Sequence, residues 1–424
     1  MNNQMKPVKS IIILSFCIVS FIAHTQEKRI LTFKDYLNNV KKSNINYLAE
    51  KYHVDIADAM VKASKVFPDP ELSISYANNQ NWNLQMGYGI DAELSYTLEL
   101  GGKRGARIRV AQSEKEMTEA LLEDYFRNLR ADATIAYLTA LKQKALLEIR
   151  ESSYAQMTHL AQADSIRFQL GDLMEVDARQ SKLEAATTRN DLYSGEGELR
   201  EALIRLALLQ GNTNLEIPDS IGGSLHHYKR DFDLSTLIAV AKNNRVDLLA
   251  VLKFQEVSQN NLRLAKANRA IDLGISLGGA YSSTVRNEIA PAPAFKGITA
   301  GISIPLKFSN TNKGEVRAAR IAVEQSRKQY ESIELQISSE VAQAYHKYET
   351  ALRRIEQFDS GMSREAETIY QKKLYSYERG ETSIFEVIHA RRAWNDVRES
   401  YNETLYECNA ALVELERACG IWDF

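Results

Sequence analysis

The sequence predicts a mainly α-helical protein with a membrane β-barrel portion, built from one unit that occurs twice. The segment 44–49 recurs as 245–250, and an internal repeat of this kind indicates a duplicated architecture. Each copy also combines short stretches of alternating apolar and polar residues with very long stretches that contain no proline. The expected order in each copy is helix, β-hairpin, long helix, turn, helix.

The N-terminal segment 1–25 is predicted to be a secretory signal peptide. Lys6 and Lys9 supply the positive start, and an apolar run follows from Ile11 to Ala23. The alternative is an uncleaved anchor. Cys17 raises the further alternative of a lipoprotein, although it follows the bulky Phe16, whereas a lipid-acceptor cysteine usually follows a small residue.

After this segment the sequence divides into two repeats joined by a linker. Proline is absent from 103–170 and from 313–379, and a proline inside a helix costs ~3 kcal/mol, so both stretches can be long helices. Gly171 and Gly380 follow them and supply the positive φ that a tight turn needs. The predicted boundaries are a first repeat at 26–211 with a helical hairpin at 103–210, a linker at 212–233, and a second repeat at 234–424 with a hairpin at 313–419.

Apolar residues recur along the second long helix at intervals of four and three. This spacing is the heptad pattern of helices that pack side by side. An isolated coiled coil would give the same local pattern. The positions are Ile337, Val341, Tyr345, Tyr348, Leu352 and Ile355.

Four strands are predicted from strict alternation of apolar and polar residues, which gives each strand one apolar face. The alternative is the edge of a soluble sandwich, but each copy offers only one hairpin, set between long helices. Four strands cannot close a membrane barrel, because known barrels begin at about eight strands. Two chains would supply eight strands and three would supply twelve, so oligomerisation is expected. The strands are 71–77, 87–99, 272–282 and 297–305.

Composition argues against several other classes of protein. The chain has 424 residues, with 53 basic and 55 acidic side chains, and it shows no basic stripe of the kind that binds nucleic acid. None of the seven histidines has the spacing of a zinc motif, and Gly101-Gly102-Lys103 lacks the spacing of a phosphate loop. We therefore expect no enzyme activity, no cofactor, no metal site and no nucleic-acid partner.

Three local motifs resemble those of the TolC-like outer-membrane efflux proteins. After the second strand, Glu99-x-Gly-Gly-Lys-Arg104, followed by Arg107, is similar to the heavy-metal and cation efflux branch of that family. The two turns, Gly171-Asp172-Leu173 and Gly380-Glu381-Thr382, are similar to the family's hairpin motifs. The resemblance covers almost the whole chain after the signal segment.

The resemblance implies a homotrimer with a 12-strand β-barrel in the lipid of the outer membrane and a long periplasmic α-helical barrel below it. It further implies a duct for metal ions or drugs, which receives them from a periplasmic adaptor (membrane fusion) protein and an inner-membrane pump of the resistance–nodulation–division type. A second hypothesis is the exit duct of a type I protein-secretion system. A third, from another class, is a periplasmic coiled-coil or adhesin protein without a transport role.

Two sets of candidate functional residues follow from the resemblance. The turns are expected to contact the adaptor, and acidic residues six positions beyond each turn glycine, with a nearby histidine, are expected to line a periplasmic gate. The alternative for the gate set is a solvated helix face. The adaptor-contact residues are Leu170, Gly171, Asp172, Arg379, Gly380 and Glu381, and the gate residues are Asp177, Glu386 and His389.

Overall fold

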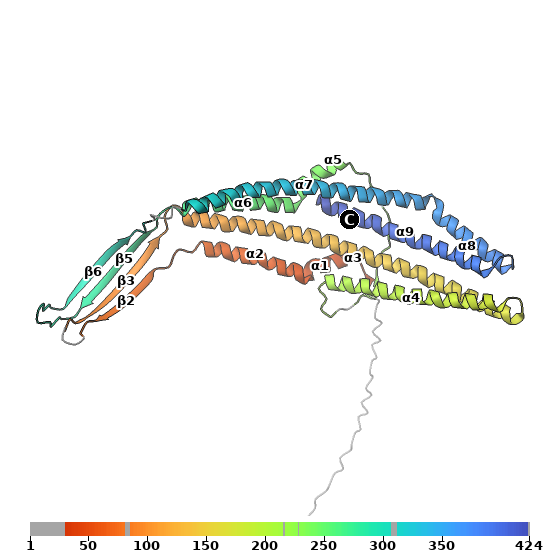
Figure 1. Cartoon of the computed structure of the whole chain (residues 1–424), viewed down its shortest axis with the longest axis horizontal. Helices are drawn as coiled ribbons and strands as arrows, with labels where there is room; N and C mark the ends of the chain where they lie inside the picture. The colour runs from red at the N-terminus through yellow and green to blue at the C-terminus, as the bar shows by residue number, and fades with distance from the viewer. Residues whose placement is uncertain (1–29, 81–84, 215–216, 228, 307–311, 423–424) are drawn as a thin grey trace, which may run out of the picture.

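The chain forms a long, narrow molecule in which the sheet and the helix turns lie at opposite ends (Figure 1). The computed structural model describes residues 30–80, 85–214, 217–227, 229–306 and 312–422. The predicted signal peptide at 1–25 and Cys17 lie outside the described residues. The long helices run from the sheet to the turns, so each copy of the repeat spans the whole length of the molecule.

The first copy contains two short helices, a β-hairpin and a helical hairpin. Its longest helix has 68 residues without a break, which corresponds to about 100 Å at ~1.5 Å per residue. The elements are β1 (Ile30–Leu31), α1 (Phe33–Ser43), α2 (Ile45–Ser64), β2 (Glu71–Asn78), β3 (Tyr88–Leu98), α3 (Lys103–Leu170) and α4 (Glu175–Leu209).

The second copy repeats this order after the short strand β4 (Ser220–Ile221). Its β6 strand begins and ends two residues earlier than the predicted range of 297–305. The repeat and linker boundaries themselves stay predictions. The elements are α5 (Leu234–Asn244), α6 (Val246–Ala267), β5 (Leu273–Ser282), β6 (Phe295–Ser303), α7 (Lys313–Gln357), the π-helical turn η2 (Phe358–Met362), α8 (Ser363–Glu378) and α9 (Ile384–Cys419).

The second long helix is interrupted, unlike the continuous hairpin that the absence of proline predicts. The π-helical turn contains Gly361 at φ +125°, a conformation that glycine adopts far more readily than other residues. Such a turn inserts an extra residue and bends the helix. The interruption therefore divides the arm into α7 and α8, whereas α3 continues through the corresponding level.

The four strands of the two copies form a single antiparallel sheet in the order β2-β3-β5-β6. β3 and β5 pair along ten residues, from Gly89 opposite Ser282 to Leu98 opposite Leu273. The two hairpins of the duplicated unit thus lie next to each other. β2 and β6 form the two outer edges of this sheet.

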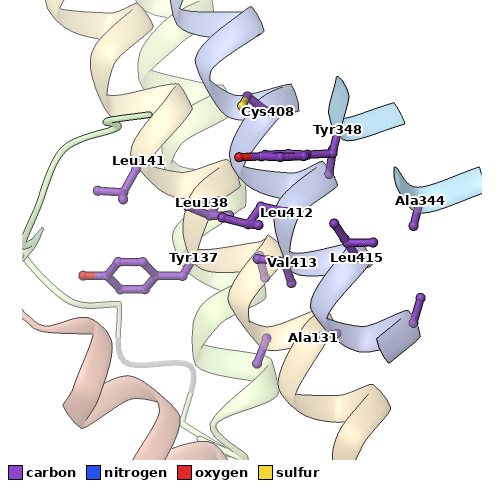
Figure 2. Close-up of a cluster of buried hydrophobic side chains, with 14 of the residues drawn as sticks. Ala131, Tyr137, Leu138, Leu141, Ala344, Tyr348, Cys408, Leu412, Val413 and Leu415 are labelled. Atoms are coloured by element: carbon purple, nitrogen blue, oxygen red, sulfur yellow. The ribbon is translucent and has the colours of Figure 1, made fainter. Parts of the chain in front are cut away.

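The middle of the molecule holds a core shared by both copies (Figure 2). Leu138 of α3, Tyr348 of α7 and Leu412 of α9 are buried together there. The hydroxyl of Tyr137 lies 2.9 Å from the carbonyl oxygen of Leu31 and 2.7 Å from that of Gly222, close to the paired strands β1 and β4. This polar contact fixes the short strands against α3.

Candidate functional site

One face of the sheet is apolar across all four strands. Leu94 of β3 lies opposite Leu72 of β2 and Leu277 of β5, and Leu277 lies opposite Ala300 of β6. Leu277 is 60% exposed in the single chain. Monomeric soluble proteins rarely expose so wide an apolar surface, which instead marks contact with lipid or another protein. Other members of this face are Ile74, Tyr76, Ile90, Tyr281, Ile298 and Ile302.

The opposite face of the sheet carries small and polar side chains. Ser75 donates a hydrogen bond to Asp91 Oδ2 at 3.2 Å across the β2–β3 pair. Glu93 lies between Ser73 and Gly278 in the same register. The sheet is thus amphipathic, with a polar face that suits water and an apolar face that suits lipid.

Ion pairs connect the sheet to the long helix α3. Arg107 contacts both carboxylate oxygens of Glu99, at 2.8 and 3.1 Å. Lys103 lies 2.6 Å from Asp272, which precedes β5. The Glu99–Arg107 motif therefore builds the strand-to-helix junction.

At the other end, the two helix turns have the same backbone geometry. Gly171 and Gly380 adopt φ +85° and +76°. The amide of Asp172 donates to Arg167 O at 2.8 Å, and that of Glu381 donates to Ser376 O at 2.9 Å. These contacts form the C-terminal cap of each descending helix, so the turns reverse the chain at the extreme end of the molecule.

The predicted adaptor-contact residues lie on the surface of these turns. Leu170 is 72% exposed, and Gly171, Asp172 and Gly380 are also exposed. Arg379 donates to Tyr375 Oη at 2.7 Å and pairs with Glu381 at 3.2 Å. Exposed apolar side chains at such an end favour contact with another protein.

The three predicted gate residues do not form one cluster. Glu386 and His389 are exposed on α9, and Glu386 pairs with Lys373 of α8 at 3.1 Å. Asp177 is half-buried on α4. Burial is the main cause that raises the pKa of Tyr377, and the hydrogen bond to Asp164 and the nearby charge of Asp177 add to this shift. Among the described residues, the structure records no hydrogen bond or ion pair that joins Asp177 to Glu386 or His389.

A buried hydrogen bond between the two helical hairpins was missed from the sequence. Tyr377 of α8 donates to Asp164 Oδ1 of α3 at 2.9 Å. Burial raises the pKa of Asp164, although the hydrogen bond from Tyr377 opposes this shift. The signal was present, because Met157, Ala161 and Asp164 are spaced like one buried helix face.

A second missed contact lies farther from the turns. Arg391 of α9 is 2% exposed and donates to Glu184 Oε1 of α4 at 2.6 Å and to Ser153 of α3. Burial lowers the pKa of Arg391. These side chains line a polar cavity of about 380 Å³. Arg391 continues the buried series Ile384 and Val387 at helical spacing, so periodicity could have placed it inside.

The described part of the chain contains neither a metal-binding cluster nor a membrane-spanning helix. Its histidine, cysteine and acidic side chains form no group of three that could hold a metal ion. Its helices contain no segment that is both long and apolar enough to cross a membrane.

The fold and its two ends define an outer-membrane channel subunit with a periplasmic helical portion. Residues 37–212 and 237–421 match the outer membrane efflux protein family, and the chain belongs to that family. The membership confirms the predicted resemblance, the mainly helical duplicated fold and the outer-membrane location. It also sets aside the adhesin hypothesis and agrees with a non-enzymatic protein, because the family consists of channels.

One curated relative and several solved structures are similar to this chain. The cobalt-zinc-cadmium resistance protein CzcC of Cupriavidus metallidurans is 26% identical over 192 residues, 45% of each protein, so the matched segment spans about half of that relative. The Campylobacter jejuni CmeC outer membrane channel has a TM-score of 0.75 and 17% identity, covering 91% of this chain and 85% of that one. CusC has a TM-score of 0.74 and 18% identity, covering 92% of both chains. The open Neisseria gonorrhoeae MtrE channel has a TM-score of 0.71 and 16% identity, covering 92% and 88%.

Proposed function

We propose that three copies of this chain form the outer-membrane duct of a tripartite efflux system. The observation that carries the proposal is the amphipathic four-stranded sheet, whose outer strands β2 and β6 each pair on one side only. Open sheet edges are not tolerated in lipid, because no water is present to satisfy the backbone. Pairing β6 of one copy with β2 of the next removes every edge, and three copies give the predicted 12 strands.

The cargo proposed for this duct is divalent metal ions or drugs delivered by an inner-membrane pump of the resistance–nodulation–division type. The similarity to a cobalt-zinc-cadmium resistance protein supports metal export. The Glu99–Arg107 motif supports the cargo only through family resemblance, since its side chains form the strand-to-helix junction. The duct itself needs no tight metal site, since a conduit must release what it carries.

The turns at the far end are proposed to contact a periplasmic adaptor protein. Leu170 and Phe385 are exposed apolar side chains there, and the charged Asp172, Arg379 and Glu381 are exposed residues of the same two turns. An apolar centre with a polar rim is typical of a protein–protein interface.

Asp177, Glu386 and His389 are proposed to line a gate at the periplasmic end of the duct. In a trimer, Asp177, Glu386 and His389 would each occur three times around a narrow opening, and like charges held together repel. Because Glu386 is paired with Lys373 at 3.1 Å, Asp177 is expected to contribute more to the negative potential. Cation selectivity at the periplasmic end would follow.

Deleting the gene tests the function directly. Cells without it should become sensitive to cobalt, zinc or cadmium salts, to drugs, or to both, and the intact gene on a plasmid should restore resistance. A Gly380→Val variant separates trimer assembly from the contact at the turn. A branched side chain is strained at φ +76°, so this substitution should disturb only the turn. It should form trimers yet restore little resistance. Loss of a secreted protein as the sole defect would favour the type I secretion hypothesis instead.

A further inference from the structure

The two helical hairpins correspond residue by residue near their turns. Gly171 and Gly380 differ by 209 positions. At this offset the amide of Gly171 donates to Phe168 O, and that of Gly380 donates to Tyr377 O, both at 3.0 Å. α4 and α9 also begin 209 residues apart, at Glu175 and Ile384. The same offset can therefore be used to compare the surfaces of the two hairpins.

The first hairpin has a groove at the position where two aromatic rings fill the second hairpin. Tyr370 of α8 stacks on Trp394 of α9, with ring centroids 5.1 Å apart and planes at 13°. The corresponding residues are Ala161 of α3 and Ala185 of α4. Both alanines line an open groove of about 630 Å³ between α3 and α4. The groove exists because two methyl groups stand where the other hairpin has two large rings.

The side chain of the first hairpin that packs on the second hairpin also has a counterpart at the same offset. Leu160 of α3 packs against the buried cluster that contains Tyr370. The residue 209 positions after Leu160 is Ile369, which is 53% exposed on α8. The first hairpin thus has an unfilled groove, and the second hairpin has an exposed apolar side chain that does not belong to its buried cluster.

We infer that Ile369 of one copy packs into the groove over Ala161 and Ala185 of the next copy. The contact would repeat between chains the packing that Leu160 makes on the second hairpin within a chain. Repeating a head-to-tail contact closes a ring when the rotation permits. The sheet is organised in the same way, because β3 pairs with β5 within the chain and β6 is left for β2 of a neighbour. The inference rests on the proposed duct and specifies its periplasmic subunit contact.

Crosslinking of the full-length protein in membranes tests this contact. Ala185→Cys combined with Ile369→Cys should give linked dimers and trimers on treatment with a short bismaleimide. Either variant alone should not. The native Cys408 and Cys419 are buried, and burial raises the pKa of each thiol to about 11, so they should react little. As a matched control, Leu183→Cys with Ile369→Cys should remain unlinked, because the exposed Leu183 lies on α4 but does not line the groove.

A size exchange gives a second test that does not depend on crosslinking geometry. Ala185→Trp, which copies the second hairpin, should fill the groove and lower trimer yield about tenfold through overpacking. Ile369→Ala in the same chain should restore the yield. Trimers that still export cargo but show neither the crosslink nor this compensation would overturn the contact and leave the duct standing. Absence of any trimer from the wild type would overturn the duct and the contact together.

Discussion

Tyr377 donates a hydrogen bond to Asp164 at 2.9 Å, joining two hairpins through residues that lie 213 positions apart in the sequence. Both residues lie close to the turns, Asp164 six positions before Leu170 and Tyr377 three before Gly380. Asp164 is fully buried. The contact therefore holds α8 against α3 at the level where a periplasmic opening would form.

Removing this hydroxyl should loosen the end of the duct. Tyr377→Phe removes one hydrogen bond to a buried acid, for which a loss of about 1–3 kcal/mol is expected. Single-channel conductance in planar bilayers should rise as the hairpins separate more often. Tyr375→Phe, on the exposed part of the same helix, should leave conductance unchanged. Equal conductance in all three proteins would show that the bond does not hold the opening closed.

The raised pKa of Asp164 gives a defined dependence of stability on pH. Burial raises its pKa above the ordinary value of 3.8, so the folded state binds its proton more tightly than the unfolded state. Its contribution to the free energy of unfolding is fully present below pH 3.8 and is lost as pH rises through the folded pKa. Asp164→Asn should abolish this one component. Melting temperatures measured from pH 4 to 7 should therefore fall relative to the variant as pH rises, and parallel curves would contradict the shift.

The buried Arg391–Glu184 pair should respond differently to single and double replacement. Arg391→Met leaves Glu184 paired with the exposed Arg392, at 2.6 Å, and breaking a buried pair typically costs about 3–5 kcal/mol. Arg391→Met with Glu184→Leu removes both charges and should recover much of that loss. Urea unfolding of the trimer measures each difference. Arg392→Met is the control for a loss at the surface, and it should cost less than Arg391→Met.

The face of the sheet that meets lipid can be tested through its register. Leu94→Arg and Ile302→Arg should each reduce outer-membrane assembly, at about 2–4 kcal/mol per chain if the residue lies at mid-bilayer. Leu94 faces Leu72 and Leu277, and Ile302 faces Ile275. Ser276→Arg, on the opposite face, is the matched control. Heat-modifiable trimer in membrane fractions is the measurement, and normal yield from both apolar-face variants would place lipid elsewhere.

The sequence predicts the parts of this fold that depend on local periodicity. Strand alternation places Leu94 and Leu277 on one face, and the register confirms that they lie opposite each other. Proline absence predicts that α3 is long, but it cannot predict the break at Gly361 in the other arm. A glycine is compatible both with a helix and with a π-helical turn, and the choice between them depends on tertiary packing.

The site residues that could not be identified from the sequence have a similar explanation. Tyr377 and Asp164 interact only because α8 and α3 are neighbours in space, which no local pattern in the sequence states. The same explanation applies to Lys373, because its ion pair with Glu386 joins α8 to α9. The resemblance located the turns and their acidic residues. It could not show which of those acids already has a basic partner.

That difference between the acids leads to the test of the gate. Asp177 and Glu386 in three copies would give six carboxylates near the opening, but each Glu386 forms an ion pair with Lys373 at 3.1 Å. Asp177→Asn should therefore weaken cation selectivity and divalent-cation block more than Glu386→Gln, and the double variant should weaken both most. His389 is three residues from Glu386 on the same face of α9. The pH dependence of divalent-cation block should therefore be compared between His389→Gln and the wild type. Planar-bilayer conductance with a divalent cation on the periplasmic side measures each quantity.

Glu175→Gln is the control, because this exposed acid of the same turn is paired with Arg179 at 2.6 Å. Block and selectivity identical to wild type in the double variant would show that these residues are a solvated helix face and that the constriction lies at another level of the tunnel.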